Sequence, residues 1–392
     1  MKILLVHNSY RQPGGEDVIF EQEAQLLRDG GQDIVVYTRS NSEIHDDSLL
    51  HRLRMAKQTV WANEPHDEIT DLLQRTSPDL VHVHNTLAMI SPSVYSACQD
   101  FRVPVVQTLH NYRLFCPEAN FLRDGRICEQ CVEKNLLHSI AHACYHDSRS
   151  ATAVLAFMLA FHRARQTWDS IHTFIALSNF AKGKFIQGGL PAHKLAVKPN
   201  FVYPDPGARN HASDFVLYVG RLSKEKGVDT LLQAWTRVQG NIPLFVIGDG
   251  PLRQELCSQY SGDPRITFRG QISRAQVVDA IKGARFLVVP SRCYENFPMA
   301  IAEAFACGVP VIAANIGAVQ ELISPERTGF LFQPNDATEL AERIEWAWNH
   351  PADTLRMGRD CRADYESKYS AERNYESLMT IYKQTISQPI LN

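Results

Sequence analysis

Residues 215–238 read FVLYVGRLSKEKGVDTLLQAWTRV, and this stretch decides the fold. Phe215–Val219 is continuously apolar, as expected for a strand that is buried on both faces of a parallel sheet. Gly220 marks a turn, and from Val228 to Val238 apolar residues recur at helical spacing. A buried strand, a short loop and a helix in this order predict one unit of a parallel α/β sheet.

The same pattern continues along the second half of the chain. Apolar runs predict further strands at Leu244–Ile247, Ile266–Phe268, Phe286–Pro290 and Val309–Ala313, and helical spacing predicts a helix at Leu252–Tyr260. Strands that alternate with helix-length segments are typical of a doubly wound α/β domain.

The first half shows a second series of this kind. It has a predicted helix at Glu16–Leu27 and predicted strands at Lys2–Val6, Asp33–Thr38, Leu80–His84, Val103–Leu109 and Thr173–Leu177. The stretch Pro199–Asp214, PNFVYPDPGARNHASD, has the composition of a linker. We therefore expect an α/β protein with two Rossmann-like doubly wound domains, residues 1–205 and 206–370. The last residues, 371–392, should form a helix that packs back on the first domain.

Composition excludes several classes of protein. The chain has 392 residues, 44% of them hydrophobic, and a net charge of −3 from 40 basic and 43 acidic side chains. These values exclude a disordered chain and disfavour nucleic acid as a partner. The apolar run in the first residues, MKILLVHNSY, is shorter than a signal peptide requires. The nine cysteines are typical of a reducing, cytoplasmic setting.

Two cations flank the turn that follows the strand 215–219. Arg221 and Lys226 lie in the loop that a doubly wound fold places at the carboxyl edge of its sheet, where ligands bind. Together they could neutralise a diphosphate without a metal, although a solvated basic loop would look the same.

A pair of glutamates follows the predicted strand 286–290. Glu295 falls in the loop and Glu303 falls inside an apolar helix, with Pro298 fitting the first helical turn. A carboxylate among apolar neighbours needs a partner, which could be a sugar diol or a structural arginine.

The first half offers two weaker signals. Pro13, Gly14 and Gly15 form a turn between a strand and a helix, which can hold a phosphate but is often only a turn. His110 ends a strand and would point to the same edge of the sheet, although a lone histidine there is more often structural.

Taken together, these motifs resemble glycosyltransferase family 4, the retaining nucleotide-sugar enzymes with the two-domain GT-B fold. The most specific blocks are YVGRLSKEKGV, VIGDGP, FRGQI and ENFPMAIAE followed by CGVPVIA. The stretch TLHNYRLFCP with RDGRICEQC is similar to a branch that occurs in bacterial surface-polysaccharide clusters. The resemblance spans essentially the whole chain and implies two Rossmann-like domains that face each other across a cleft.

The resemblance also implies roles for individual residues. Arg221 and Lys226 would bind the donor diphosphate, Glu303 the ribose and Glu295 the donor sugar, with His110 beside that sugar. The N-terminal turn of Gly14 and Gly15 would approach the diphosphate. The edge of the base pocket would comprise Gly248, Asp249, Gly250, Arg269 and Gly270. Further donor contacts would come from Asn296, Phe297, Pro298 and Met299. Many family members have glycine where Pro298 stands, so Phe297 or Met299 would have to supply the amide that proline lacks.

The activity implied is transfer of a sugar from a nucleotide diphosphate to an acceptor hydroxyl, with retention of configuration and without a metal. The expected acceptor is a saccharide or a lipid-linked intermediate of a bacterial surface glycan. A nucleotide-sugar epimerase and a non-catalytic sugar-nucleotide-binding protein are the alternatives on the same architecture.

Four cysteines lie close together in the insertion 116–144. Cys116, Cys128, Cys131 and Cys144 have the spacing C-x11-C-x2-C-x12-C, which predicts a structural zinc site. Nearby His138, His142 and His146 could replace a thiolate, and Asp124-Gly125 marks a turn between the first two cysteines. Buried thiols and a redox disulfide are the alternatives.

One apolar run lies in the basic part of the chain. Residues 151–161, ATAVLAFMLAF, are too few to span a bilayer, which takes about 20 residues. The run could rest on the inner face of the cytoplasmic membrane, since arginines flank it, or it could be a buried core helix.

Overall fold

The computed structural model describes residues 1–392 except 12–13, 45–47, 134, 211–213 and 389–392, and it leaves the side chains of residues 49–51 undescribed. Pro13 of the N-terminal turn and part of the 199–214 linker therefore lie outside the described residues. Contacts divide the chain into two units. Unit 1 comprises Met1–Phe121, Glu129–Pro199 and Asn374–Asn392, and unit 2 comprises Leu122–Cys128 and Asn200–Arg373.

Unit 1 is built on a six-stranded parallel sheet with the order β2-β1-β3-β4-β7-β8. Its strands are β1 (Lys2–Ser9), β2 (Asp33–Ser40), β3 (Leu80–Asn85), β4 (Val105–Leu109), β7 (Thr173–Ala176) and β8 (Leu195–Val197). The helices are α1 (Gly15–Asp29), α2 (Leu49–Val60), α3 (Asn63–Thr76), α4 (Ser93–Asp100), α7 (Arg149–Ala164) and α8 (Asn179–Gln187). The middle strands β3 and β4 are entirely buried, as their valines and leucines predict, and β3 also carries two buried histidines.

The insertion between β4 and α7 contains short elements. It has a hairpin of β5 (Leu122–Arg123) and β6 (Arg126–Ile127), and two helices, α5 (Gln130–Glu133) and α6 (Leu137–Ala141). The hairpin turns at Asp124 and Gly125, both of which have positive φ angles, as the Asp-Gly signal predicts.

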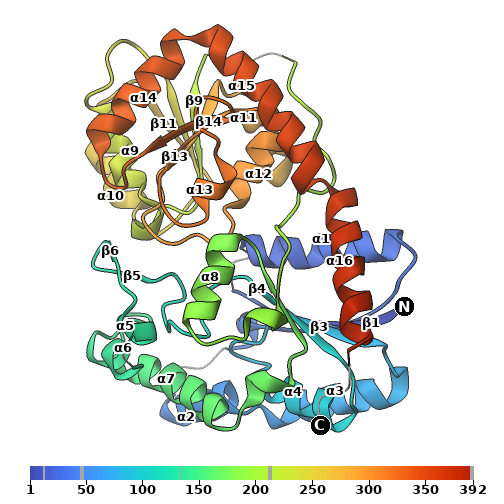
Figure 1. Cartoon of the computed structure of the whole chain (residues 1–392). Helices are drawn as coiled ribbons and strands as arrows, with labels where there is room; N and C mark the ends of the chain where they lie inside the picture. Colours follow the sequence, from blue (N-terminus) through green and yellow to red (C-terminus); the bar gives the residue numbers. More distant parts are fainter. Residues whose placement is uncertain (12–13, 45–47, 134, 211–213, 389–392) are drawn as a thin grey trace. The chain divides into compact units, whose positions relative to one another are not determined.

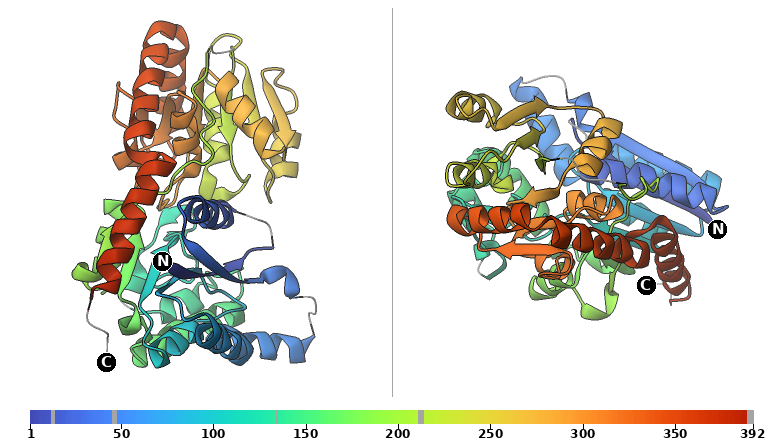
Figure 2. Two further views of the ribbon diagram at one scale, coloured as in Figure 1. Left: turned by 90° about the vertical axis from the view of Figure 1, so that its right-hand side faces the viewer. Right: turned by 90° about the horizontal axis from the view of Figure 1, so that it is seen from above.

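The last helix, α16 (Ala371–Ile386), packs on the sheet of unit 1 through its second half (Figure 2). Its Leu378, Ile381 and Tyr382 join a buried cluster with Ile3 and Leu5 of β1. The Thr385 hydroxyl lies 2.8 Å from that of Thr173 on β7.

Unit 2 is built on a second six-stranded parallel sheet, with the order β11-β10-β9-β12-β13-β14. Its strands are β9 (Val216–Val219), β10 (Leu244–Ile247), β11 (Ile266–Gly270), β12 (Phe286–Val289), β13 (Val311–Ala314) and β14 (Gly329–Phe332). The helices are α9 (Val228–Trp235), α10 (Arg253–Tyr260), α11 (Arg274–Gly283), α12 (Met299–Ala306), α13 (Val319–Leu322), α14 (Ala337–Asn349) and α15 (Pro351–Asp364). Within this unit, α9 and α14 lie on one side of the sheet and α11 and α12 on the other (Figure 1).

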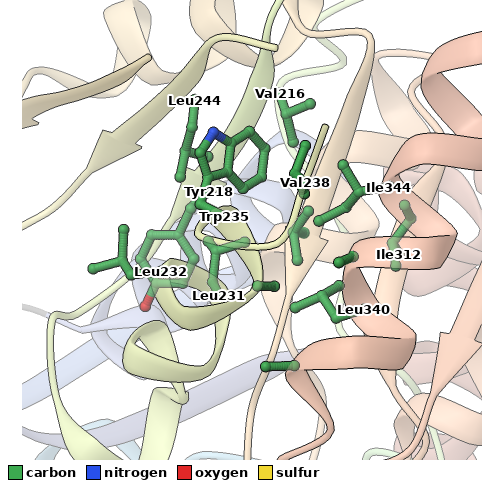
Figure 3. Packing of buried hydrophobic residues seen from close by; sticks show 14 of the residues in the cluster. Val216, Tyr218, Leu231, Leu232, Trp235, Val238, Leu244, Ile312, Leu340 and Ile344 are labelled. Carbon is green, nitrogen blue, oxygen red and sulfur yellow. The ribbon is translucent and has the colours of Figure 1, made fainter. Parts of the chain in front are cut away.

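The main core of unit 2 lies between its sheet and the helices α9 and α14 (Figure 3). Trp235 of α9 is fully buried there, and its indole nitrogen donates to the Ile242 carbonyl at 3.2 Å. Leu340 and Ile344 of α14 pack beside it and are also fully buried. This core holds β9 rigidly, so the loop that leaves its carboxyl end has a fixed starting point.

The strand orders locate the ligand-binding edge of each sheet. In unit 2 the chain order reverses between β9 and β12, and in unit 1 it reverses between β1 and β3. Open α/β sheets bind their ligands outside the carboxyl ends of the strands at such reversals. The predicted α/β class with two Rossmann-like sheets is therefore confirmed, and the site should be built on the loops after these strands.

Candidate active site

The reversal point of unit 2 carries an ion pair between two loops. Lys226 follows β9 and Glu295 follows β12, and the Lys226 Nζ lies 2.5 Å from the Glu295 Oε1. The same Oε1 accepts a hydrogen bond of 2.8 Å from the Ser291 hydroxyl. The two residues that the sequence placed 69 positions apart thus meet where a ligand is expected.

This pair keeps both of its members charged. Burial by itself would lower the pKa of Lys226, but the Glu295 carboxylate raises it above the ordinary value of lysine. Burial would likewise raise the pKa of Glu295, yet the Lys226 ammonium holds it below the ordinary value. The Lys226 side chain remains one-third exposed, so it can also reach a bound anion.

Arg221 occupies the start of the same loop and is exposed. Its backbone carbonyl is held by the Tyr218 hydroxyl at 2.9 Å, which fixes the point where the side chain begins. Among the residues that the structure describes, no carboxylate pairs with the guanidinium, so its charge is available to a ligand.

Backbone contacts close the other loops of this edge tightly together. The Gly248 N–H donates to the Gly270 carbonyl at 2.9 Å, and the Leu222 N–H donates to the Asp249 carbonyl at 2.9 Å. Gly248 has a φ of +137°, and a Cβ placed on it would lie 1.9 Å from the Gly220 carbonyl oxygen. Gly220, Gly248 and Gly270 thus lie close together at the ends of β9, β10 and β11, and at Gly248 a larger residue would clash with the backbone.

Two arginines border these glycines. Arg253 reaches Asp249 at 3.3 Å, and its guanidinium lies beside Gly270. Arg269 is exposed and stacks over the Phe245 ring at 4.0 Å from the ring centroid. A planar ring and a guanidinium at this edge suit a flat, polar ligand.

The segment before α12 differs slightly from the sequence prediction. The helix begins at Met299, and Pro298 stands immediately before it in an extended conformation rather than in the first turn. Asn296 and Phe297 are buried, and the Phe297 ring packs against Tyr369 at 5.5 Å. The free backbone amides of the first helical turn therefore begin at Met299.

Glu303 is half-buried on α12 among apolar neighbours. Burial raises the pKa of its carboxyl, and the charge of Arg274 offsets only part of that shift. In the described part of the chain, no side chain hydrogen-bonds to this carboxylate.

In unit 1, His110 is part of a buried network. Its Nε2 lies 2.9 Å from the Nδ1 of His84, the penultimate residue of β3. The His84 Nε2 lies 3.2 Å from the Oε1 of Glu23 on α1, and the Glu23 Oε2 accepts from Lys198 at 3.0 Å. Glu23 and Lys198 are each 1% exposed.

Sequence reasoning missed the three residues behind His110. Glu23 lies in α1, whose sequence shows only the usual helical spacing of apolar residues. Lys198 follows β8, a three-residue strand that the apolar pattern did not predict. The alternation of His82 and His84 on β3 was the one available signal, because a buried strand seldom carries two histidines.

The same residues form the one cluster with metal-ligand spacing among those described: Glu23, His82 and His84. A metal fits poorly here. The Lys198 ammonium already lies 3.0 Å from the carboxylate, and both nitrogens of His82 have partners, the hydroxyls of Tyr382 at 2.7 Å and Thr108 at 2.8 Å. A second cation would have to displace these groups.

The N-terminal turn has one free amide and one that is occupied. The Gly14 N–H donates to the Asp17 carboxylate at 2.7 Å, so it cannot serve a phosphate in this arrangement. Gly15 starts α1 and is exposed, which leaves its amide accessible. Glu16 follows, and burial together with Asp17 raises its pKa to about 8, so it is largely protonated at neutral pH.

Comparisons with known proteins match this geometry. A family model described as Glycosyltransferase Family 4 matches residues 13–205, and one described as Glycosyl transferases group 1 matches residues 203–363. In structure, the chain is similar to Anabaena HepE in complex with UDP, with a TM-score of 0.69, 20% identity and coverage of 98% of this chain and 100% of that one.

The chain is a GT-B glycosyltransferase of family 4.

Two curated relatives illustrate the range of the family. N-acetyl-α-D-glucosaminyl L-malate synthase of Bacillus anthracis is 19% identical over 398 residues, which cover 97% of each chain. O-antigen chain mannosyltransferase C of Escherichia coli is 27% identical over 173 residues, 43% of this chain and 46% of that one. The epimerase and the non-catalytic binding protein, the alternatives from sequence, are not favoured by these matches.

A pocket of the glycosyltransferase lies beside His110 in unit 1. Its lining combines polar groups of β3, β4 and the segment after β4 with apolar side chains of α7 and the turn that follows it, among them Asn85, Gln107, His110, Arg113, Met158 and Trp168. The Gln107 Oε1 is buried and has no hydrogen-bond partner within the described residues. The pocket therefore offers both hydrogen-bonding groups and an apolar wall.

The predicted zinc site is not supported in this glycosyltransferase. All four cysteines fall within the described residues, yet they do not form a group with metal-ligand spacing there. Cys116 is buried after β4, Cys131 lies on α5 and Cys144 follows α6. The hairpin and short helices of the insertion separate them, a feature that cysteine spacing alone does not reveal.

The apolar run 151–161 forms most of α7. Leu155, Met158 and Leu159 point into a buried cluster, whereas Phe157 is 60% exposed. In the described chain, no helix combines the length and the apolar character needed to cross a bilayer. One face of α7 is therefore buried in the core of unit 1, as the alternative to membrane contact predicted.

Proposed function

We propose that the protein is a retaining glycosyltransferase that moves a sugar from a nucleotide-diphosphate donor to an acceptor hydroxyl. The observation that carries this proposal is the meeting of Lys226 and Glu295 at the reversal point of unit 2, with the charge of Arg221 beside them. A diphosphate needs cations at such an edge, and a sugar needs a carboxylate next to them.

The donor would lie along the carboxyl edge of unit 2. Arg221 and Lys226 would bind the diphosphate, together with amides at the start of α12. The half-buried Glu303 would accept hydrogen bonds from the ribose diol, which accounts for a carboxylate without a protein partner. The base would rest against the edge formed by Gly248–Gly250, Arg269 and Gly270.

Two cations can do the work that a metal does in other transferases. As the bond between the anomeric carbon and the diphosphate breaks, negative charge grows on the leaving phosphate. Arg221 and Lys226 would stabilise that charge directly, so the proposal includes independence from divalent metals.

We favour attack on the same face from which the diphosphate leaves. The acceptor oxygen would bond to the anomeric carbon while the bond to the diphosphate oxygen breaks, and the hydroxyl proton would pass to that leaving oxygen. Glu295 suits a supporting role better than that of a nucleophile, because Lys226 and Ser291 both bind its Oε1. It would orient sugar hydroxyls near the reacting carbon.

The pocket beside His110 is the proposed acceptor site. Its polar groups can bind sugar hydroxyls, and the apolar wall from α7 suits a lipid-linked acceptor. We therefore propose an acceptor from the assembly of a bacterial surface glycan, in keeping with the O-antigen enzyme among the relatives.

Such an acceptor would place the protein at the inner face of the cytoplasmic membrane. Phe157 on α7 and Leu53 on α2 are both about 60% exposed, and α2 also carries Arg52, Arg54 and Lys57. Apolar and basic side chains on packed helices favour anionic lipid. Co-sedimentation with anionic vesicles at low salt should fall on Phe157→Ser with Leu53→Ser, and binding unchanged by both would contradict this location.

The stereochemical part of the proposal has a direct test. The protein would be incubated with α-linked nucleotide sugars and an octyl glycoside acceptor, and the product linkage would be read by proton NMR. An α-linked product is expected. A β-linked product would contradict retention while leaving the transferase assignment in place.

A further inference from the structure

A chain of buried polar groups runs through unit 1 and ends at His110. It passes from Lys198 to Glu23, from Glu23 to His84 and from His84 to His110, with contacts of 3.0, 3.2 and 2.9 Å. The four residues come from or directly follow β8, α1, β3 and β4. Burying a charge such as that of Glu23 or Lys198 is costly unless it has a partner. The contacts among these four residues are therefore part of how unit 1 is stabilised.

The charge at the inner end of the chain is settled by Lys198. Burial would raise the pKa of Glu23, but the Lys198 ammonium and the two histidines hold it well below the ordinary value. Glu23 is therefore an anion. Burial lowers the pKa of His84 and of His110, so both rings are neutral at physiological pH.

Neutral rings in this order leave one consistent placement of protons. The His84 Nε2 faces the Glu23 anion and must carry the proton, since a lone pair there would face negative charge. The His84 Nδ1 is then an acceptor, and the His110 Nε2 must donate to it. The remaining nitrogen of His110, Nδ1, is left with a lone pair, and His110 lines the pocket.

We propose that Lys198, Glu23 and His84 are positioning residues that hold His110 as the Nε2–H tautomer and present its Nδ1 as a hydrogen-bond acceptor to a substrate hydroxyl. The substrate part rests on the proposed sugar transfer. The hydroxyl would be one of the donor sugar or of the acceptor, and a group that could only accept a hydrogen bond would not be recognised.

His82 meets the same series of polar groups at Glu23. Its Nδ1 lies 3.2 Å from the Glu23 Oε1 and 2.7 Å from the Tyr382 hydroxyl, and its Nε2 lies 2.8 Å from the Thr108 hydroxyl. Removing the Tyr382 hydroxyl leaves each contact from Lys198 through Glu23 and His84 to His110 in place, which makes Tyr382→Phe a matched control.

The first test compares two replacements of His84. Asparagine keeps an oxygen acceptor close to the place of Nδ1, whereas leucine removes it. We expect His84→Leu to lower kcat/KM by about 10-fold or more, and His84→Asn to restore most of that loss. Tyr382→Phe should stay within about twofold of the wild type.

A double-mutant cycle separates positioning from general damage. In a His110→Ala background, the His84→Leu change should have little further effect, because the residue through which it acts is gone. An equal loss in both backgrounds would overturn the proposal and make His84 a structural residue.

The tautomer itself can be read without any substrate. Long-range nitrogen–proton NMR on histidine-labelled protein, assigned with His110→Asn, should show the His110 proton on Nε2. In Glu23→Gln/Lys198→Met, which removes both charges together, this preference should be lost. A proton on Nδ1 in the wild type overturns the proposal even if the protein transfers sugar, and the NMR result stands even if no nucleotide sugar is turned over.

Discussion

Lys226 shows how a single side chain can be held ready for an anion. Its ammonium pairs with Glu295 at 2.5 Å, so its charge persists in a position that is only one-third exposed. Arg221 keeps its charge because it is exposed to solvent rather than because it is paired with a carboxylate. The two cations therefore differ in what their loss does to the fold: removing Lys226 leaves Glu295 without its countercharge, whereas removing Arg221 leaves nothing unpaired.

Replacing either cation should reduce turnover without unfolding the protein. Arg221→Met and Lys226→Met are each expected to lower kcat by about 10²-fold or more, because each removes charge stabilisation from the leaving phosphate. Initial rates of nucleoside diphosphate release, with thermal melting in parallel, provide the measurement. Lys224→Met is the control, since Lys224 is an exposed cation of the same loop. Rates within twofold of the wild type for both variants would remove the diphosphate assignment.

Glu303 should make nucleotide affinity depend on pH. Below its raised pKa the carboxyl is protonated and loses acceptor capacity for a diol, so calorimetry should show affinity falling as pH is lowered, starting above the usual range of glutamate. Glu303→Gln should weaken binding by about 10- to 100-fold at neutral pH and abolish this dependence.

The same substitution should not lower the stability of the protein, although it weakens nucleotide binding. A raised carboxyl pKa means that ionisation of Glu303 disfavours the folded state, so stability is lost as pH rises through that pKa. Glu303→Gln should thus melt at the same temperature as the wild type or higher at neutral pH. A large drop in Tm with unchanged nucleotide affinity would instead identify Glu303 as structural.

At the scale of single residues, the sequence predicted the groups that follow strands and missed those beneath them. Arg221, Lys226 and Glu295 could be found because each lies in a loop at a strand's carboxyl end. Glu23 and Lys198 could not, because their pairing at 3.0 Å joins residues 175 positions apart and depends on how α1 crosses the sheet. Periodicity contains no information about such a contact.

The elements of unit 2 bring three loops closer than side chains would allow. Gly248 follows β10, and the loop after β9 passes so near that a Cβ would lie 1.9 Å from the Gly220 carbonyl oxygen. The loops consequently share backbone hydrogen bonds and act as one rigid edge.

Gly248→Ala should therefore separate these loops. We expect a loss of stability well beyond the roughly 1 kcal/mol that a strained backbone alone costs, together with weaker nucleotide binding. Gly240→Ala is the control, because Gly240 also has a positive φ but has open space around it. Denaturant unfolding of the two variants measures the difference. Equal losses would show that the close approach has no role.

The strands of the two six-stranded sheets were predicted well, with two exceptions. β8 has only three residues, and β14 begins at a glycine with a φ of +154°, so the first lacks the length and the second the starting residue that mark a strand. Each lies at an outer end of its sheet, where pairing with one neighbour is enough to order a short segment. The insertion 116–144 was predicted from its cysteines to hold a structural zinc, which the described residues do not support, and it contains a hairpin and short helices.

At the scale of the whole molecule, the chain forms two six-stranded sheets with the same kind of topology. Both sheets are parallel, and both reverse their strand order beside the first strand of their unit. The sequence predicted this because the strand-loop-helix rhythm restarts after residue 214. The order of strands within each sheet could not be predicted, since periodicity identifies elements but not their neighbours.

Activity of the whole protein should not require a divalent metal. Cationic side chains occupy the edge where a metal–carboxylate pair would otherwise bind the diphosphate, so excess EDTA is expected to leave the rate unchanged. Adding Mg²⁺ afterwards should have no effect either. A rate that collapses with EDTA and returns with Mg²⁺ would contradict the charge-neutralising role of Arg221 and Lys226.

The most direct test of the central claim is release of nucleoside diphosphate from a panel of nucleotide sugars. Purified protein would be incubated with uridine, guanosine, adenosine and thymidine diphosphate sugars, with Arg221→Met/Lys226→Met as the blank and Lys224→Met as the positive control. The account predicts release from at least one donor by the wild type and the Lys224 variant, and a rate at least about 10²-fold lower for the double variant. Equal release by the double variant, or no release and no calorimetric binding of any donor, would contradict it.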